Sequence, residues 1–345
     1  KERGHEVHLV GFAEDAAEIA AASPLSAYCS SYHLVTLEPG AAKMRAARSL
    51  LTGKPPSVEY FNSPDMRSIV ETIVSNNPIQ AVVVYSSTMS QYVPEALRPH
   101  TFVDMADVDS EKWMDYAEET NPPMKWVYGL EGRRLREYEY WIVRNFGITS
   151  LHTQREIDVL KDLSPDELKR LIPITNGVDL EKFKPTPVEE LVPGKIPEAE
   201  RRFFDELNVP RVVFTGAMDY RPNAEACIWF ANDILPLIRA KYPNARFQVV
   251  GSKPTAEVLA LGGDPGIDVT GFVDSVLPYL AAATVCVVPL KIARGVQNKA
   301  LEAMAAGRAV IATRDVITGV GAREGQHLLH AQTEGEFADK VINVI

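Results

Sequence analysis

The sequence predicts an α/β protein made of two domains, each built on a parallel β-sheet with helices on both faces. Short apolar runs typical of buried strands alternate with helical segments along most of the chain, which is the pattern of parallel sheets. A proline-rich stretch, residues 184–210, separates two such series and is typical of a linker. With 345 residues, the chain is long enough for two independent cores.

The first series, residues 1–183, contains six strand-like runs with helix-start signals between them. Ser63 precedes Pro64, which favours the start of a helix, and Thr153 and Glu156 have the spacing of a capping box. The strand-like runs are 7–12, 32–37, 80–86, 101–105, 147–151 and 172–175, and helices are expected over 13–22, 41–51, 64–76 and 124–146.

The second series, residues 211–345, repeats this pattern and places glycine at several strand ends. Gly216 and Gly251 end the first two strand-like runs. Asp274 is expected to cap the helix after the third run. Gly307 lies where a helix would end, because glycine readily adopts the left-handed conformation found there. The first strand-like run begins at Val213. The later runs are 245–251, 267–273, 284–289 and 309–313.

Composition excludes several classes of function. The formal net charge is −10, so a general nucleic-acid-binding surface, which has to be basic, is not expected. The three cysteines stand apart without zinc spacing, and no apolar run approaches the ~20 residues of a membrane span. P-loop, HExxH and GxSxG motifs are absent. We therefore expect a globular cytoplasmic protein with reduced, buried cysteines.

Residues 288–313 form a strand–loop–helix–strand unit with the residues of an anion-binding site. The loop and first helical turn hold Lys291, Arg294 and Lys299, and the N–H groups and dipole of a helix N-terminus attract phosphate. Glu302 lies one turn beyond Lys299 on the same helix face, where a carboxylate suits a ribose diol. An ordinary parallel-sheet unit with a solvated charged loop explains the spacing equally well.

The sequence of this stretch is VPLKIARGVQNKALEAMAAGRAVIAT. It resembles the nucleotide-sugar signature of glycosyltransferase family 4, whose fold is named GT-B. That signature has two glutamates separated by seven residues. Glu302 matches the second glutamate, whereas Arg294 occupies the first position and departs from the family. The variant RGVQNK resembles the sugar transferases associated with PEP-CTERM/exosortase exopolysaccharide loci. The phrase NGVDLEKF, residues 176–183, is similar to the hinge of the family.

This resemblance implies two Rossmann-like domains that face each other across a cleft. The acceptor would bind to residues 1–183 and the nucleotide sugar to residues 211–345, on either side of the linker. We expect Arg294 to bind the diphosphate and the backbone N–H groups of 295–297 to hold the sugar. In the family, the backbone at the position of Phe272 and Val273 contacts the base.

A second family position is altered in this chain. Gly216 matches a family glycine, but Ala217 stands where the family has an arginine, so Arg221 is considered as its substitute. The expected donor-binding residues are Gly216, Arg221, Phe272, Val273, Lys291, Arg294, Gly295, Val296, Gln297, Asn298, Lys299 and Glu302.

Three aspartates, Asp104, Asp107 and Asp109, follow a strand-like run, at the strand end where open α/β sheets bind ligands. We expect Asp104 and Asp107 to be catalytic by orienting the acceptor hydroxyl; the exosortase-associated branch has similar aspartates. Asp109 suits a helix cap. His100 precedes this strand and His152 ends a later one, and both are interpreted as structural.

The resemblance implies a glycosyltransferase that moves a sugar from a nucleoside diphosphate to a glycan or polyprenyl-linked acceptor. The pathway would be exopolysaccharide or other cell-surface polysaccharide biosynthesis, with anomeric retention and without a metal or other cofactor. The helix expected over 41–51 carries Lys43, Arg45 and Arg48. These cations suit peripheral contact with an anionic membrane or a lipid-linked diphosphate, although a solvated helix face has the same pattern.

Two other functions fit the same fold. A nucleotide-sugar 2-epimerase would use the same donor without an acceptor, and a non-catalytic module would bind the nucleotide sugar without turnover. The opening phrase KERGHEVHLV is similar to the end of the first helix and the start of the second strand of the family, and the last residues stop within a helical pattern. We therefore expect a further strand, its glycine-rich loop and part of the last helix to lie outside this sequence.

Overall fold

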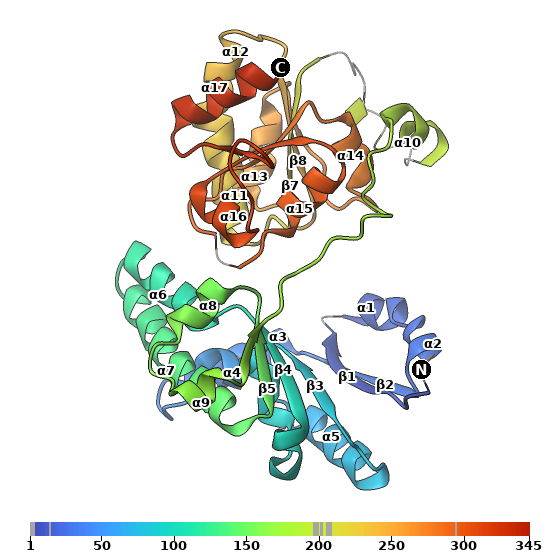
Figure 1. Ribbon diagram of the computed structural model, residues 1–345, viewed down its shortest axis with the longest axis vertical. Helices are drawn as coiled ribbons and strands as arrows, with labels where there is room; N and C mark the ends of the chain where they lie inside the picture. Colours follow the sequence, from blue (N-terminus) through green and yellow to red (C-terminus); the bar gives the residue numbers. More distant parts are fainter. Residues whose placement is uncertain (1–3, 14, 196–199, 201–202, 205–208, 294) are drawn as a thin grey trace. The chain divides into compact units, whose positions relative to one another are not determined.

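The computed structural model describes residues 4–13, 15–195, 200, 203–204, 209–293 and 295–345. The chain divides into two compact units, Lys1–Ile174 and Thr175–Ile345. Every strand pair in both units is parallel (Figure 1). The predicted α/β class with two Rossmann-like domains is confirmed.

The N-terminal unit contains one sheet of two strands and one of four, in the orders β1-β2 and β3-β4-β5-β6. All six strands lie within two residues of the predicted runs. The strands are β1 (His8–Ala13), β2 (Ser31–Thr36), β3 (Val82–Tyr85), β4 (Thr101–Ala106), β5 (Ile148–Leu151) and β6 (Leu171–Pro173).

Helices and 3-10 turns connect these strands, and two of their starts use the predicted caps. Ser63 Oγ accepts a hydrogen bond from the Met66 N–H, and Thr153 Oγ1 accepts one from the Glu156 N–H. The helical elements are α1 (Ala16–Ala21), α2 (Leu25–Tyr28), α3 (Pro39–Ser49), α4 (Pro56–Tyr60), α5 (Pro64–Asn76), η1 (Ser87–Tyr92), η2 (Glu95–His100), α6 (Asp109–Glu119), α7 (Met124–Asn145), α8 (Gln154–Val159) and α9 (Pro165–Leu168).

One face of the four-stranded sheet differs from the prediction of helices on both faces. Val84 is buried, but Val83 and Tyr85 on the opposite face of β3 are 76% and 70% exposed. The register pairs Val83 with Phe102 and Phe102 with Ile148, so these side chains share that face, and Ile148 is also exposed. The apolar alternation predicts the strands correctly. It does not show that this part of the sheet is left uncovered by the described elements.

The C-terminal unit has a six-stranded parallel sheet in the order β12-β11-β10-β7-β8-β9. From β7 the chain adds β8 and β9 on one side and then crosses to β10 on the other, so the strand order reverses between β7 and β10. This reversal is the topological switch point at which open α/β sheets bind ligands. The strands are β7 (Arg211–Thr215), β8 (Arg246–Val250), β9 (Ile267–Val269), β10 (Val285–Val288), β11 (Ala309–Ala312) and β12 (Leu329–His330).

One of the two helix boundaries predicted for this unit is confirmed. Gly307 has φ +71° just after α15, as expected of a glycine that ends a helix. Asp274 does not cap a helix: α14 starts at Leu277, because Pro278 suits a first helical turn. The helical elements are α10 (Val188–Lys195), α11 (Arg221–Trp229), η4 (Phe230–Ile234), α12 (Leu235–Arg239), α13 (Ala256–Ala260), η5 (Leu261–Gly263), α14 (Leu277–Ala282), α15 (Asn298–Ala305), α16 (Arg314–Gly319) and α17 (Glu334–Val344).

The boundary between the units lies earlier than the predicted domain end at residue 183. Phe183 is buried in the core of the C-terminal unit, and Val178 packs against that core. Asn176 Nδ2 donates a hydrogen bond to Asn298 Oδ1 over 3.1 Å. Residues 175–183 therefore belong to the C-terminal unit and reach its helix α15. Among the described helices, none is long and apolar enough to cross a membrane.

Candidate functional site

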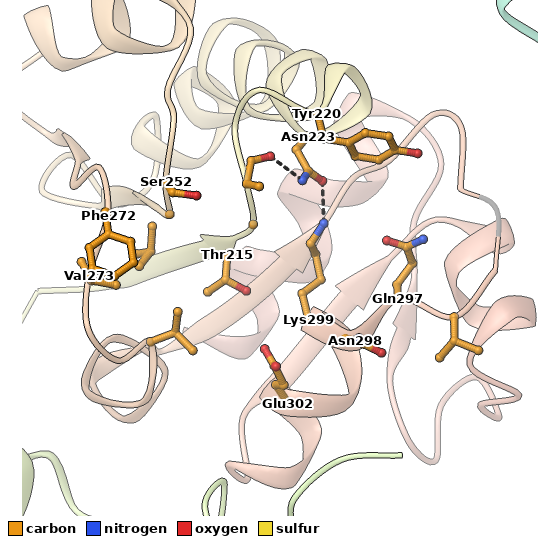
Figure 2. Close-up of a pocket in the computed structure, with 16 residues that line it drawn as sticks. Thr215, Tyr220, Asn223, Ser252, Phe272, Val273, Gln297, Asn298, Lys299 and Glu302 are labelled. Atoms are coloured by element: carbon orange, nitrogen blue, oxygen red, sulfur yellow. Dashed lines mark hydrogen bonds between the residues drawn. The ribbon is translucent and has the colours of Figure 1, made fainter. Parts of the chain in front are cut away.

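A pocket of about 480 Å³ lies at the switch point of the C-terminal sheet, within the range of small-molecule sites. It is built from the carboxyl ends of β7 and β8, the start of α11, the loop after β9 and the first turns of α15 (Figure 2). The lining residues are Thr215, Gly216, Ala217, Tyr220, Asn223, Val250, Gly251, Ser252, Phe272, Val273, Val276, Val296, Gln297, Asn298, Lys299 and Glu302.

Two glycines allow the ends of β7 and β8 to meet at the pocket floor. Gly251 has φ +150°, and a Cβ on it would overlap the carbonyl oxygen of Gly216. A Cβ on Gly216 would lie 2.7 Å from Asn223 Nδ2. A side chain at Gly251 would therefore push apart the backbone that forms the floor, and one at Gly216 would displace the Asn223 side chain.

Lys299 is the cation at the centre of the pocket. Its Nζ donates a hydrogen bond to Asn223 Oδ1 over 2.5 Å, and Asn223 Nδ2 donates to the Ala217 carbonyl over 2.8 Å. The Lys299 ammonium lies 4.8 Å from the centre of the Phe214 ring. Burial lowers the pKa of Lys299 to about 8, since it disfavours the charged form. The nearby Glu302 carboxylate acts in the opposite direction and favours the charged form.

Glu302 lies one turn beyond Lys299 on α15, as Figure 2 shows. Burial raises the pKa of its carboxyl, while Lys182 and Lys299 oppose that rise. Lys182 comes from the segment 175–183 that packs on this unit. The carboxylate is half-buried and lines the pocket, so it can accept hydrogen bonds from the hydroxyl groups of a ligand.

The rim beside the loop after β9 is apolar. Phe272 is 74% exposed, and its ring stands beside Val273 at the pocket edge (Figure 2). Tyr220, the residue just before α11, also lines the pocket. An exposed aromatic ring at a pocket edge offers a flat surface on which a planar ligand group can stack.

Most of the predicted donor-binding residues line this pocket. They are Gly216, Phe272, Val273, Val296, Gln297, Asn298, Lys299 and Glu302.

Three predicted residues do not line the pocket, and a fourth lies outside the described residues. Arg221 Nε pairs with Glu225 Oε1 over 2.6 Å, one turn further along α11. Lys291 Nζ lies 4.7 Å from the centre of the Trp229 ring. Gly295 is buried, with its carbonyl against Gly319. Arg294 is the residue that the structure does not describe.

The sequence interpretation missed Asn223 and Gly251 as parts of the site. Gly251 had a visible signal, because it ends a strand-like run as Gly216 does. Asn223 had none, since its role depends on a lysine 76 residues away. The other lining residues without a prediction are Thr215, Ala217, Tyr220, Val250, Ser252 and Val276.

The aspartates of the N-terminal unit occupy different environments. Asp104 Oδ1 accepts hydrogen bonds from the Ala106 N–H and from Ser150 Oγ, both over 3.0 Å. Asp107 Oδ1 lies 3.4 Å from His152 Nδ1. Asp109 is the first residue of α6 rather than its cap, and burial raises its pKa. Among the described residues, no group of three or more His, Cys, Asp or Glu side chains is placed to hold a metal ion.

Comparison with known families identifies the C-terminal unit. Residues 209–345 match the family described as "Glycosyl transferases group 1". This matched segment, called the group 1 domain, makes up most of the C-terminal unit. The pocket lies within this group 1 domain, at the switch point of its sheet. The glycosyltransferase class expected from the sequence is confirmed, and no curated protein sequence matches the chain.

Solved structures share the fold at low identity. Sucrose-phosphate synthase from Thermosynechococcus elongatus superposes with TM-score 0.64 at 14% identity, over 98% of this chain and 90% of that one. Anabaena Alr3699/HepE in complex with UDP-glucose gives 0.60 at 12%, over 98% and 89%. WaaG, a glycosyltransferase involved in lipopolysaccharide biosynthesis, gives 0.60 at 14%, over 98% and 90%. These similarities, which extend over nearly the whole chain, support the GT-B fold.

Proposed function

We propose that the chain transfers a sugar from a nucleoside-diphosphate sugar, bound in the pocket of the group 1 domain, to a hydroxyl of a glycan or polyprenyl-linked acceptor. The observation that carries this proposal is that a partly buried cation, Lys299, and a carboxylate, Glu302, lie one turn apart at the switch point. A diphosphate needs a cation and helix N–H groups, and a ribose diol needs an acceptor of hydrogen bonds.

The same geometry suits departure of the diphosphate. Negative charge grows on the diphosphate as the bond to the anomeric carbon breaks, and Lys299 together with the N-terminus of α15 would stabilise it. A protein cation can supply this stabilisation in place of a metal ion, so we propose a metal-independent reaction. Glu302 would hold the ribose, and Phe272 with the backbone at Val273 would contact the base. We also propose retention at the anomeric carbon, on the resemblance to family 4.

A role in cell-surface polysaccharide biosynthesis at the inner face of the membrane is the finer part of the proposal. Arg45 of α3 donates hydrogen bonds to the carbonyls of Glu59 and Tyr60, so it is engaged within the unit. Lys43 and Arg48 remain exposed, beside Met44 and Leu51, which are 56% and 92% exposed. Cations that surround exposed apolar side chains suit an anionic bilayer surface. The fraction of protein that sediments with phosphatidylglycerol vesicles should be lower for the double variant Lys43→Glu, Arg48→Glu than for the wild type.

Calorimetry with UDP-, GDP- and ADP-sugars tests the donor part of the proposal. One of these classes should bind, and Lys299→Ala should weaken it at least tenfold. Arg221→Ala is the matched control, because Arg221 pairs with Glu225 outside the pocket, and it should leave the affinity unchanged. Equal losses in both variants, or no binding of any sugar nucleotide, would reject the proposal.

Product analysis separates transfer from its two rivals. NMR of the reaction with the bound sugar nucleotide should show nucleoside diphosphate together with a glycosidic or hydrolysed sugar, in the presence and absence of EDTA. Free 2-epimer formed without any acceptor would indicate an epimerase instead. Binding without turnover on any acceptor would indicate a non-catalytic module.

A further inference from the structure

The segment 175–183 is held against helix α15, which carries part of the pocket. Phe183 is buried in the core of the C-terminal unit, and Val178 packs against that core. At the start of the segment, Asn176 Nδ2 donates a hydrogen bond to Asn298 Oδ1 over 3.1 Å. Asn298 is the first residue of α15 and lines the pocket. Residues 175–183 do not line the pocket themselves, so Asn176 acts on a ligand through Asn298.

This hydrogen bond determines which end of the Asn298 amide faces Asn176. A side-chain amide has one accepting oxygen and one nitrogen that donates. Because Asn176 donates, Asn298 presents Oδ1 to it and keeps Nδ2 for another partner. Within the part of the chain that the structure describes, Nδ2 of Asn298 has no hydrogen-bond partner. Its N–H groups are therefore available to an oxygen of a ligand in the pocket.

The amide of an asparagine without such a partner has no fixed orientation. Its last side-chain torsion is broad and roughly two-fold, so either Oδ1 or Nδ2 can face a ligand. An Oδ1 that faces a phosphate repels it, whereas an Nδ2 donates a hydrogen bond to it. A group that is already in its binding orientation also loses less entropy when the ligand arrives. The hydrogen bond from Asn176 therefore selects the orientation that favours an anion.

The place of Asn298 on α15 suits the diphosphate. The side chain of Gln297, the residue before the helix, makes no capping hydrogen bond. An N-terminus without a side-chain cap, with Lys299 in its first turn, favours phosphate. Glu302, the expected ribose contact, lies one turn further along the helix (Figure 2). Asn298 is thus at the diphosphate end of this row of pocket residues.

The other end of the segment also acts on the pocket. Lys182 Nζ lies 5.1 Å from the centre of the ring of Phe183, the residue that anchors the segment. Burial raises the pKa of the Glu302 carboxyl, and the charge of Lys182 opposes this rise. Asn176 and Lys182 therefore influence Asn298 and Glu302, which share one face of α15.

We propose that Asn176 is a positioning residue of the donor site, which holds the Asn298 amide so that Nδ2 donates a hydrogen bond to an oxygen of the donor diphosphate. This inference rests on the proposed function and adds to its donor site a residue from outside the pocket. The two amides are neutral, so Asn176 orients Asn298 without changing the charge of the site.

Calorimetry with pyrophosphate and with the nucleoside diphosphate of the sugar nucleotide that binds tests this proposal. Asn298→Ala should weaken both ligands about tenfold, as expected for a lost hydrogen bond to a charged group. Asn176→Leu has a similar size but no donor, and it should weaken both about three- to tenfold. The double variant should lose no more than Asn298→Ala alone, because Asn176 acts through Asn298.

Thr175→Val is the matched control, because the Thr175 hydroxyl donates to the neighbouring Asn176 carbonyl within the segment. This variant should leave both affinities unchanged.

Asn176→Asp tests the orientation of the amide directly. An aspartate accepts but does not donate, so it would draw Asn298 Nδ2 to itself and turn Oδ1 toward the ligand. The variant should therefore bind both ligands more weakly than Asn176→Leu. Its added charge also repels an anion, so the same substitution is made in Asn298→Ala. The part of the loss that disappears in that background comes from the turned amide.

Several outcomes would overturn the proposal. Losses that simply add in the double variant would show that Asn176 acts by another route, such as the stability of the segment. An unchanged affinity in Asn298→Ala would remove Asn298 from the site, and a loss confined to the nucleoside diphosphate would place it at the ribose. If the wild type binds pyrophosphate but no sugar nucleotide, the proposed function fails, and non-additive losses of pyrophosphate binding would still support the role of Asn176.

Discussion

Lys299 Nζ donates a hydrogen bond to Asn223 Oδ1 over 2.5 Å, and this contact ties the first turn of α15 to the first turn of α11. The two helices follow β10 and β7, the neighbouring strands between which the sheet order reverses. The bond therefore draws two helix N-termini toward one point, where their dipoles act together on an anion.

Replacing this lysine should weaken every diphosphate ligand. Lys299→Met should lower the affinity for nucleoside diphosphate and for pyrophosphate by about ten- to a hundredfold, since a hydrogen bond to a charged group is worth roughly 1.5–3 kcal/mol. Lys291→Met, whose ammonium lies over Trp229, is the control and should have little effect. Equal losses for the two variants would contradict the role of Lys299.

The pH dependence of binding follows from the same side chain. Burial lowers the pKa of Lys299 to about 8, so the free protein loses this charge as pH rises through that value. The affinity for nucleoside diphosphate should therefore decline above pH 8, and this decline should disappear in Lys299→Met. Calorimetry from pH 6.5 to 9.5 measures both trends, and parallel profiles for the two proteins would refute the assignment.

Glu302→Gln should discriminate between ligands. If the carboxylate holds the ribose, the variant should bind nucleoside diphosphate about tenfold or more weakly and keep its affinity for pyrophosphate, which has no ribose. Glu225→Gln, whose carboxylate pairs with Arg221 outside the pocket, serves as the control. Loss of pyrophosphate binding as well would indicate a general disturbance of the pocket rather than a ribose contact.

Gly251→Ala should damage the floor of the pocket. The added Cβ would overlap the Gly216 carbonyl, so the variant should lose stability on the order of 1–3 kcal/mol together with donor binding. Gly262→Ala introduces the same methyl group where no atom lies within 4 Å, and it should fold and bind normally. Urea unfolding and calorimetry on both variants check this pair, and a stable Gly251→Ala protein with full affinity would contradict it.

Glu139 of α7 predicts a pH-dependent stability in the N-terminal unit. This fully buried carboxyl accepts hydrogen bonds from the Ser110 N–H and Oγ, and burial raises its pKa to about 8. The folded state therefore keeps a proton that the unfolded chain loses near its ordinary pKa of 4.5. The stabilisation is complete below pH 4.5 and is lost as pH rises through 8, at up to ~1.4 kcal/mol per pH unit.

Glu139→Gln should remove this pH-dependent contribution to stability. The unfolding free energy of the variant should therefore increase relative to that of the wild type as pH rises. Urea unfolding at pH 5, 6, 7 and 8 measures the difference. Glu137→Gln, on the exposed face of the same helix, should run parallel to the wild type. A constant difference for Glu139→Gln across this range would show that the carboxyl is not protonated in the fold.

Local patterns in the sequence were sufficient for the secondary structure and for part of the site. Apolar alternation and cap residues depend on near neighbours, and so the strands lie within two residues of their predicted positions in the N-terminal unit. The spacing of Lys299 and Glu302 places them on one helix face in any α-helix, and both line the pocket. The phrase around these two residues is also sufficient to indicate the glycosyltransferase class.

Only the tertiary structure decided which charged groups work together. Arg221 and Lys291 have the right charge and sequence position, yet each interacts with a neighbour outside the pocket. Asn223 joins Lys299 from another helix, and Asp107, which follows β4, lies 3.4 Å from His152, which follows β5. These partnerships depend on which strands become neighbours in the sheets. That outcome depends on packing across the whole unit, and a local pattern contains no information about residues that lie dozens of positions away.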